Sequence, residues 1–137
     1  MFKTVLFPID QTRESRHAAE LVVNIVKTYG SSLTVLSVVE SVQDEKKEVT
    51  DPEMASPEAI AKLLETAKTL FHDQGIEADT MHQSGKPAFV ICDIADEIEA
   101  DLIIMGSRGM GITEEGIADS VSNRVINLSP CPVLIVP

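Results

Sequence analysis

Hydrophobic residues gather in five short runs along the chain, separated by four longer stretches in which they recur at helical spacing. The runs are Thr4–Ile9, Leu33–Val39, Ile76–Gln83, Leu102–Met105 and Pro132–Val136. Three of them are nearly continuous in Val, Leu, Ile and Met, which is typical of strands that are buried on both faces of a parallel sheet. The third run alternates along its length, so we predict that it forms an edge strand.

The stretches between the runs predict amphipathic helices, because their apolar residues fall on one face at a period of about 3.6. The four predicted stripes are Ala18, Leu21, Val22, Ile25 and Tyr29; Ile60, Leu63, Leu64, Ala67 and Phe71; Ile91, Ile94, Ala95 and Ile98; and Ile117, Val121, Val125 and Leu128. Gly30 and Gly75 follow the first two stripes, where helices commonly end on a left-handed glycine. Pro57 and Pro87 are expected to open the second and third helices.

Strict alternation of strand and helix indicates one doubly wound α/β domain over residues 1–137, a five-stranded parallel sheet with helices on both faces. We expect the strand order 3-2-1-4-5. In such a sheet ligands bind beyond the carboxyl ends of the strands, at the point where the strand order reverses. That switch point lies between the first and fourth strands, which are followed by the loops Asp10–Thr12 and Gly106–Thr113.

Closely spaced glycines mark the second of these loops. Backbone N–H groups of Gly106, Gly109 and the turn at 119–121 would form an anion site if they converge on one point. Asp119 complicates this interpretation, since its carboxylate repels a phosphate. Three outcomes stay open: Asp119 caps the following helix, points to solvent, or binds a divalent metal ion together with Asp10.

Composition narrows the classes of partner. The chain has 22 acidic and 11 basic residues and a formal net charge of -11, which disfavours nucleic acid and anionic membranes. We see no membrane span or signal peptide and expect a cytoplasmic protein. Cys92 and Cys131 lie far apart without a CxxC pattern, so we expect two reduced, buried thiols.

Sequence signals for catalysis are weak. The chain lacks the G-x-x-x-x-G-K-[ST] motif, the G-x-S-x-G motif and paired histidines at helical spacing, each of which would indicate a particular chemistry. No general base is identified beside these missing motifs, so the residues themselves give no support for catalysis.

Five segments, in order along the whole chain, resemble the universal stress protein family. They are Phe7–Asp10, Leu36–Glu40, Met105–Gly109, Ser120–Ser122 and Pro130–Val136. The resemblance implies a Rossmann-like fold of the adenine nucleotide alpha hydrolase type and a homodimer formed through the last strand, Pro132–Val136. It also implies that ATP or AMP is a possible ligand, with Mg²⁺ accompanying ATP. Without an identified general base, we expect at most slow ATP hydrolysis, with Asp10 holding the metal.

Family members that bind nucleotide resemble the pattern G-x-x-G, nine residues, then G-S or G-T. Gly106, Gly109 and Ser120 match this pattern, while Asp119 stands where the third glycine is expected. Two functions follow: a dimeric regulatory module that binds an adenine nucleotide, or a nucleotide-free dimeric scaffold whose phosphate site is blocked or capped by Asp119.

The resemblance also implies roles for individual residues. Those that would contact the nucleotide are Pro8 and Val38 at the adenine, Met105 at the adenosine, Asp10 near phosphate, ribose or metal, and Gly106, Gly109, Ser120 and Val121 as donors to phosphate. Arg108 lies near the loops and would offset the negative field. Simpler roles are open for some of them, since Pro8 would also end a strand, Val38 and Met105 would also fill a core, and Asp10 would also cap a helix.

Overall fold

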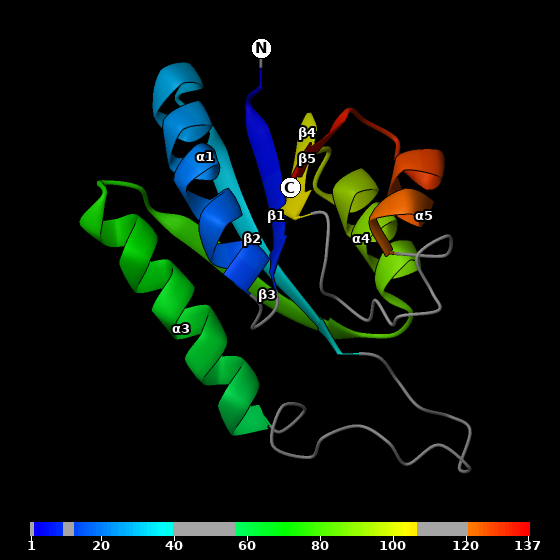
Figure 1. Ribbon diagram of the computed structural model, residues 1–137, viewed down its shortest axis with the longest axis horizontal. Helices are drawn as coiled ribbons and strands as arrows, with labels where there is room; N and C mark the ends of the chain where they lie inside the picture. The colour runs from blue at the N-terminus through cyan, green and yellow to red at the C-terminus, as the bar shows by residue number, and fades with distance from the viewer. Residues whose placement is uncertain (1, 10–12, 40–56, 107–120) are drawn as a thin grey trace.

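A five-stranded sheet forms the centre of the molecule in the computed structural model (Figure 1), which describes residues 2–9, 13–39, 57–106 and 121–137. The strands are β1 (Thr4–Ile9), β2 (Ser32–Val39), β3 (Ala78–Ser84), β4 (Leu102–Gly106) and β5 (Val133–Val136). Every neighbouring pair is parallel, and the order is β3-β2-β1-β4-β5. The expected strand order and the edge position of the third strand are therefore confirmed.

Helices cover both faces of this sheet, as the alternating pattern predicts (Figure 1). They are α1 (Arg13–Tyr29), α3 (Pro57–Asp73), α4 (Pro87–Glu97) and α5 (Val121–Leu128). Side chains of α1 and α3 pack on one face in a cluster that includes Phe7, Val35 and Ile104. Side chains of α4 and α5 pack on the other face in a second cluster around Leu6, Ile91 and Ile103. We call this second group the α4/α5 cluster.

The end of α3 explains where β3 begins. Gly75 has φ +84, its N–H donates to His72 O at 2.8 Å, and the Ile76 N–H donates to Phe71 O at 2.8 Å. These are the two hydrogen bonds of a Schellman motif, and buried Ile76 packs in the same cluster as buried Phe71. Ile76 therefore closes the helix, and the strand starts at Ala78 rather than at the expected Ile76.

Two residues of the predicted helical stripes lie outside the core. Tyr29 is 46% exposed and packs edge-on against Phe2, with 5.2 Å between ring centroids. Leu128 is 47% exposed at the end of α5, where the buried residues are Ser122 and Val125. Both stand in the last turn of a helix. Ile117, also predicted for a stripe, falls outside the described residues.

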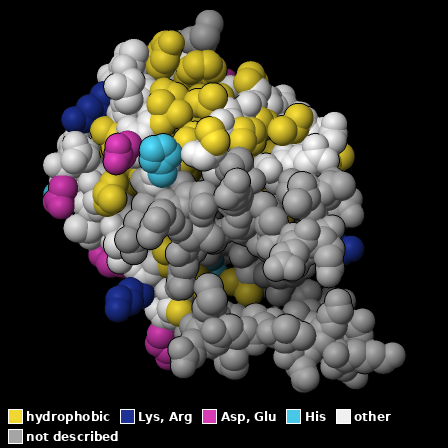
Figure 2. All heavy atoms as spheres, viewed as in Figure 1, with side chains coloured by type: hydrophobic (Ala, Val, Ile, Leu, Met, Phe, Trp, Pro, Cys, Tyr) yellow, Lys and Arg dark blue, Asp and Glu magenta, His cyan; other side chains and the backbone are white. Residues whose placement is uncertain are grey.

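The edge strand β5 is short and incompletely covered. Val133, Leu134 and Ile135 are each half-buried, and only Val136 is buried. Hydrophobic side chains gather on the upper half of the face shown in Figure 2, over the region where Figure 1 places β5 and the C-terminus. An apolar edge of this kind is a surface suited to pairing with another chain.

Candidate functional site

The hydrogen-bonded ladder between β1 and β4 ends before the strands do. Its register pairs are Val5 with Leu102 and Leu6 with Ile103, although β1 continues to Ile9 and β4 to Gly106. The outer ladders, in contrast, continue to the strand ends: Ile9 of β1 pairs with Ser37 of β2, and Gly106 of β4 pairs with Val136 of β5. The carboxyl ends of β1 and β4 are thus not paired with each other, and this is the switch point where ligands bind in open α/β sheets.

Pro8 contributes to this separation. It stands in the part of β1 that is not paired with β4, opposite Leu36 of β2. Proline has no N–H group to donate to a neighbouring strand. Because a proline inside a sheet removes one ladder hydrogen bond, prolines in sheets are found mostly in edge strands and at bulges. A buried proline in a central strand is therefore consistent with a ladder that stops at Leu6.

The amino ends of the same two strands are fastened together. Asp101 Oδ2 accepts hydrogen bonds from the N–H groups of Lys3 and Thr4, both at 3.0 Å. The Asp101 N–H donates to Thr4 O at 2.8 Å. The β1–β4 pair is therefore joined by a side chain at one end and unpaired at the other.

Three of the predicted site residues meet in the α4/α5 cluster. Met105 is a buried member of this cluster, and Val38 and Val121 are half-buried side chains packed against it. Val38 lies past the end of β1, since Ile9, the last residue of β1, pairs with Ser37. At 1% exposure Met105 is a core side chain, whereas Val38 and Val121 keep accessible surface for a ligand.

The remaining predicted site residues differ in how much the structure says of them. Gly106 is the half-buried last residue of β4 and pairs with Val136, and Val121 is the first residue of α5. Five predicted residues lie outside the described residues: Asp10, Arg108, Gly109, Asp119 and Ser120.

Gly85 is a residue near the switch point that the sequence reasoning missed. It joins β3 to α4, has φ +143, and donates its N–H to Val39 O, the last carbonyl of β2, at 2.9 Å. A glycine directly before Lys86 and the helix-opening Pro87 is the sequence signal that would have identified it.

Both cysteines are free thiols, but only one is buried as expected. Cys92 lies in the α4/α5 cluster, while Cys131 is half-exposed in the turn before β5, where its N–H donates to Ser129 Oγ at 3.1 Å. Burial raises the pKa of the Cys92 thiol above 9.0, and the Asp93 carboxylate and Cys131 raise it further. Burial also raises the pKa of the Cys131 thiol, partly offset by the hydrogen bond with Ser129 and reinforced by Asp101.

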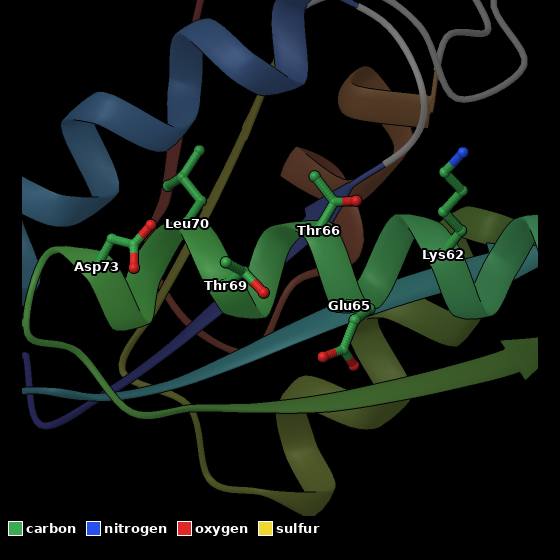
Figure 3. A pocket seen from close by; sticks show the side chains of 6 residues that line it. All are labelled: Lys62, Glu65, Thr66, Thr69, Leu70 and Asp73. Carbon is green, nitrogen blue, oxygen red and sulfur yellow. The ribbon is translucent and has the colours of Figure 1, made fainter.

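Two hollows lie away from the switch point, on the side of the sheet that α3 covers. One, of about 280 Å³, is bounded by Ile60, Ala61, Leu64, Glu65, Thr80 and His82. The other, of about 520 Å³, has α3 residues on its described wall: Lys62, Glu65, Thr66, Thr69, Leu70 and Asp73. Figure 3 shows that these side chains leave the helix in different directions, with Glu65 pointing away from Thr66 and Lys62. They therefore do not form a set of polar groups around one ligand position.

In the described ranges, no three His, Cys, Asp or Glu side chains are grouped so that they could hold a metal ion. The helices within these ranges are likewise too short or too polar to cross a membrane.

Comparison with known proteins gives one consistent match. The sequence model of the universal stress protein family matches residues 1–137. A universal stress protein of Synechocystis sp. is 55% identical, covering 100% of this chain and 87% of the relative. A universal stress protein of Bacillus subtilis is 33% identical, covering 99% of both chains.

Solved structures of similar fold belong to the same group. A universal stress protein from Lactobacillus plantarum has a TM-score of 0.82 at 22% identity, covering 99% of this chain and 98% of its own. A universal stress protein in complex with cAMP has a TM-score of 0.79 at 24% identity, covering 99% and 97%. A family member from Arabidopsis thaliana with AMP bound has a TM-score of 0.75 at 20% identity, covering 98% and 90%.

Proposed function

The chain belongs to the universal stress protein family, and from that premise we propose that it is a dimeric regulatory module that binds an adenine nucleotide at the switch point. The observation that supports this most is the β1–β4 ladder, which stops at Leu6 and Ile103, so that the carboxyl ends of these two strands are not paired with each other. Proteins of the same fold have been solved with cAMP and AMP. An unpaired strand end in the middle of a parallel sheet is where such a ligand fits.

The base would lie against apolar side chains. Val38 and Pro8 would form the walls beside the adenine, and Met105 would support the adenosine from within the α4/α5 cluster. Aliphatic side chains give such a site its affinity through burial, while a few polar groups orient the ligand.

The phosphates would lie toward the glycine loop and the start of α5. Gly106, Gly109 and Ser120, with the N–H of Val121, would donate hydrogen bonds to the phosphates, because α5 begins at Val121 and the amino end of a helix favours an anion. Asp10 would lie near the ribose or hold Mg²⁺ when ATP is bound, and Arg108 would offset the negative field.

Asp119 sets the preference between ligands in this proposal. Its carboxylate repels phosphate by roughly 1 kcal/mol when partly screened, and ATP carries more negative charge than AMP. Replacing Asp119 with Gly or with Asn is therefore expected to raise ATP affinity about fivefold and AMP affinity less. Asp119→Asn removes the charge without introducing a glycine into the turn, so it tests the effect of the charge alone. Equal changes in ATP and AMP affinity would contradict a role of the Asp119 charge in ligand preference. Titration calorimetry measures both affinities.

The alternative function is a nucleotide-free dimeric scaffold. Asp119 favours it, because a carboxylate just before α5 can accept the hydrogen bonds that a phosphate would otherwise take. The two functions are separated by denaturing the purified protein, identifying any released adenine nucleotide by mass spectrometry, and titrating ATP and AMP into emptied protein. Absence of binding at millimolar nucleotide would reject the binding module and leave the scaffold.

We further propose that two copies pair through β5 and that the dimer works in the cytoplasm. The half-buried side chains of β5 support the first part, and two free thiols support the second. Turnover of ATP is not part of the proposed function, and any hydrolysis would be slow and incidental.

A further inference from the structure

The carboxyl end of β2, which carries the proposed adenine wall, is held by β3. Within the part of β1 that the structure describes, the ladder to β2 ends with Ile9 and Ser37. On the other side Val38 pairs with Gln83 and Val39 with Ser84. The position of Val38 therefore depends on β3 and on the turn that follows it.

Gly85 extends the support that β3 gives to the end of β2. Its N–H donates to Val39 O at 2.9 Å and so adds one hydrogen bond after the last residue of β3. At φ +143 its backbone is in a region that residues with a side chain rarely adopt. A Cβ on Gly85 would lie 2.8 Å from Val90 Cγ2, closer than two carbon atoms approach without displacement.

Val90 connects this turn to the proposed site. It stands in the first turns of α4 and packs against the α4/α5 cluster, as do Val38 and Val121, with Met105 inside it. A side chain at Gly85 would therefore strain the bond to Val39 and push Val90 toward the cluster that the adenine would contact.

We infer that Gly85 is a positioning residue for adenine recognition: its backbone conformation and its bond to Val39 fix the end of β2 so that Val38 lies against the base. This role rests on the proposed nucleotide binding. It places one determinant of base affinity outside the ligand contacts, on the β3–α4 turn.

Titration calorimetry of AMP and GMP into wild type and Gly85→Ala tests this role. We expect Gly85→Ala to raise the Kd for AMP on the order of tenfold, with the number of sites per chain unchanged. The ratio of the Kd for GMP to the Kd for AMP is expected to become smaller than in wild type. A purely structural effect gives fewer sites at the wild-type Kd, and that result would overturn the inference. Unchanged Kd values would overturn it as well.

The matched control is Gly75→Asn, because Gly75 also has a positive φ, +84, but a Cβ there meets nothing within 4 Å. It is expected to keep the AMP affinity. Should Gly85→Ala fail to fold, Val90→Ala provides the second variant, with an expected rise in Kd for AMP of about threefold at full stoichiometry. If Val90→Ala then bound AMP with the same Kd as wild type, the inference would be overturned. If the wild-type protein itself did not bind AMP, the proposed function would be rejected, and the inference with it.

Discussion

At the scale of single residues, the carboxylate of Asp101 joins two strands that are 97 residues apart in sequence. Asp101→Ala removes the acceptor of both the Lys3 and Thr4 N–H groups. Since hydrogen bonds to charged groups contribute about 1.5–3 kcal/mol and this carboxylate is half-exposed, we expect a loss of about 1–2 kcal/mol. Urea unfolding followed by circular dichroism measures it.

The control for this substitution is Asp93→Ala, because Asp93 is exposed on α4. It is expected to change the free energy of unfolding by less than about 0.5 kcal/mol. Equal stability of the two variants would show that the Asp101 bonds contribute nothing measurable.

The two thiols give stability a dependence on alkaline pH. Burial raises both pKa values above 9.0 in the folded protein, so the unfolded chain loses these protons first. Their contribution is therefore complete below the unfolded pKa and is lost as the pH rises through the folded pKa. We expect the urea midpoint of wild type to fall more between pH 8 and pH 10.5 than that of the double variant Cys92→Ala, Cys131→Ala. If the urea midpoints of the two proteins fell by the same amount over this pH range, the thiols would not be the cause of the pH dependence.

The sequence predicted part of the candidate site. The position of the switch point follows from the strand order, whereas Val38, Met105 and Val121 were implied by the resemblance to the universal stress protein family. The role of Gly85 did not, because its importance comes from a hydrogen bond to Val39 and a close approach to Val90 across the chain. Such contacts depend on tertiary packing, which no local pattern contains.

At the scale of elements, helix ends follow local chemistry closely. Gly75 closes α3 with both Schellman hydrogen bonds and the pairing of Phe71 with Ile76. Alanine in this left-handed position costs about 1–2 kcal/mol, so Gly75→Ala is expected to lower the free energy of unfolding by that amount. Asparagine tolerates the conformation better, and Gly75→Asn should lose less. Thermal and urea unfolding of both variants check the ranking, and a stability of Gly75→Ala equal to wild type would contradict it.

Elements were predictable where one period dominates and less so at their ends. β1 has its expected bounds, whereas β4 extends one residue further, to Gly106. Tyr29 and Leu128 continue the helical period but are exposed, each in the last turn of its helix. Periodicity reports which face of a helix is apolar, and only the packed structure determines how far the sheet covers that face.

At the scale of the whole molecule, the two edges of the sheet differ. β3 ends it with half-exposed and exposed residues, while β5 presents a short apolar strand. If two copies pair through β5, a charge placed there separates them, because an unpaired lysine would be buried at the interface. Ile135→Lys is therefore expected to sediment as a folded monomer at concentrations where wild type is a dimer.

Ile126→Lys is the matched control, since Ile126 is 52% exposed on α5 and lies outside the sheet. It should keep the dimer mass. A monomeric wild type, or dissociation of both variants alike, would contradict pairing through β5, and circular dichroism of each variant verifies that it is folded.

The β1–β4 pair is fastened by Asp101 at its amino end, whereas its carboxyl end has no ladder pairing between the two strands. Under the proposed function, a ligand that enters between the carboxyl ends of the two strands would act on the same ladder that Asp101 fastens at the other end. The free energy of ligand binding and that of the Asp101 hydrogen bonds would then be coupled, and each would change the other by the same amount. Asp101, at the far end of the strands, would thereby help to set the nucleotide concentration at which the protein responds.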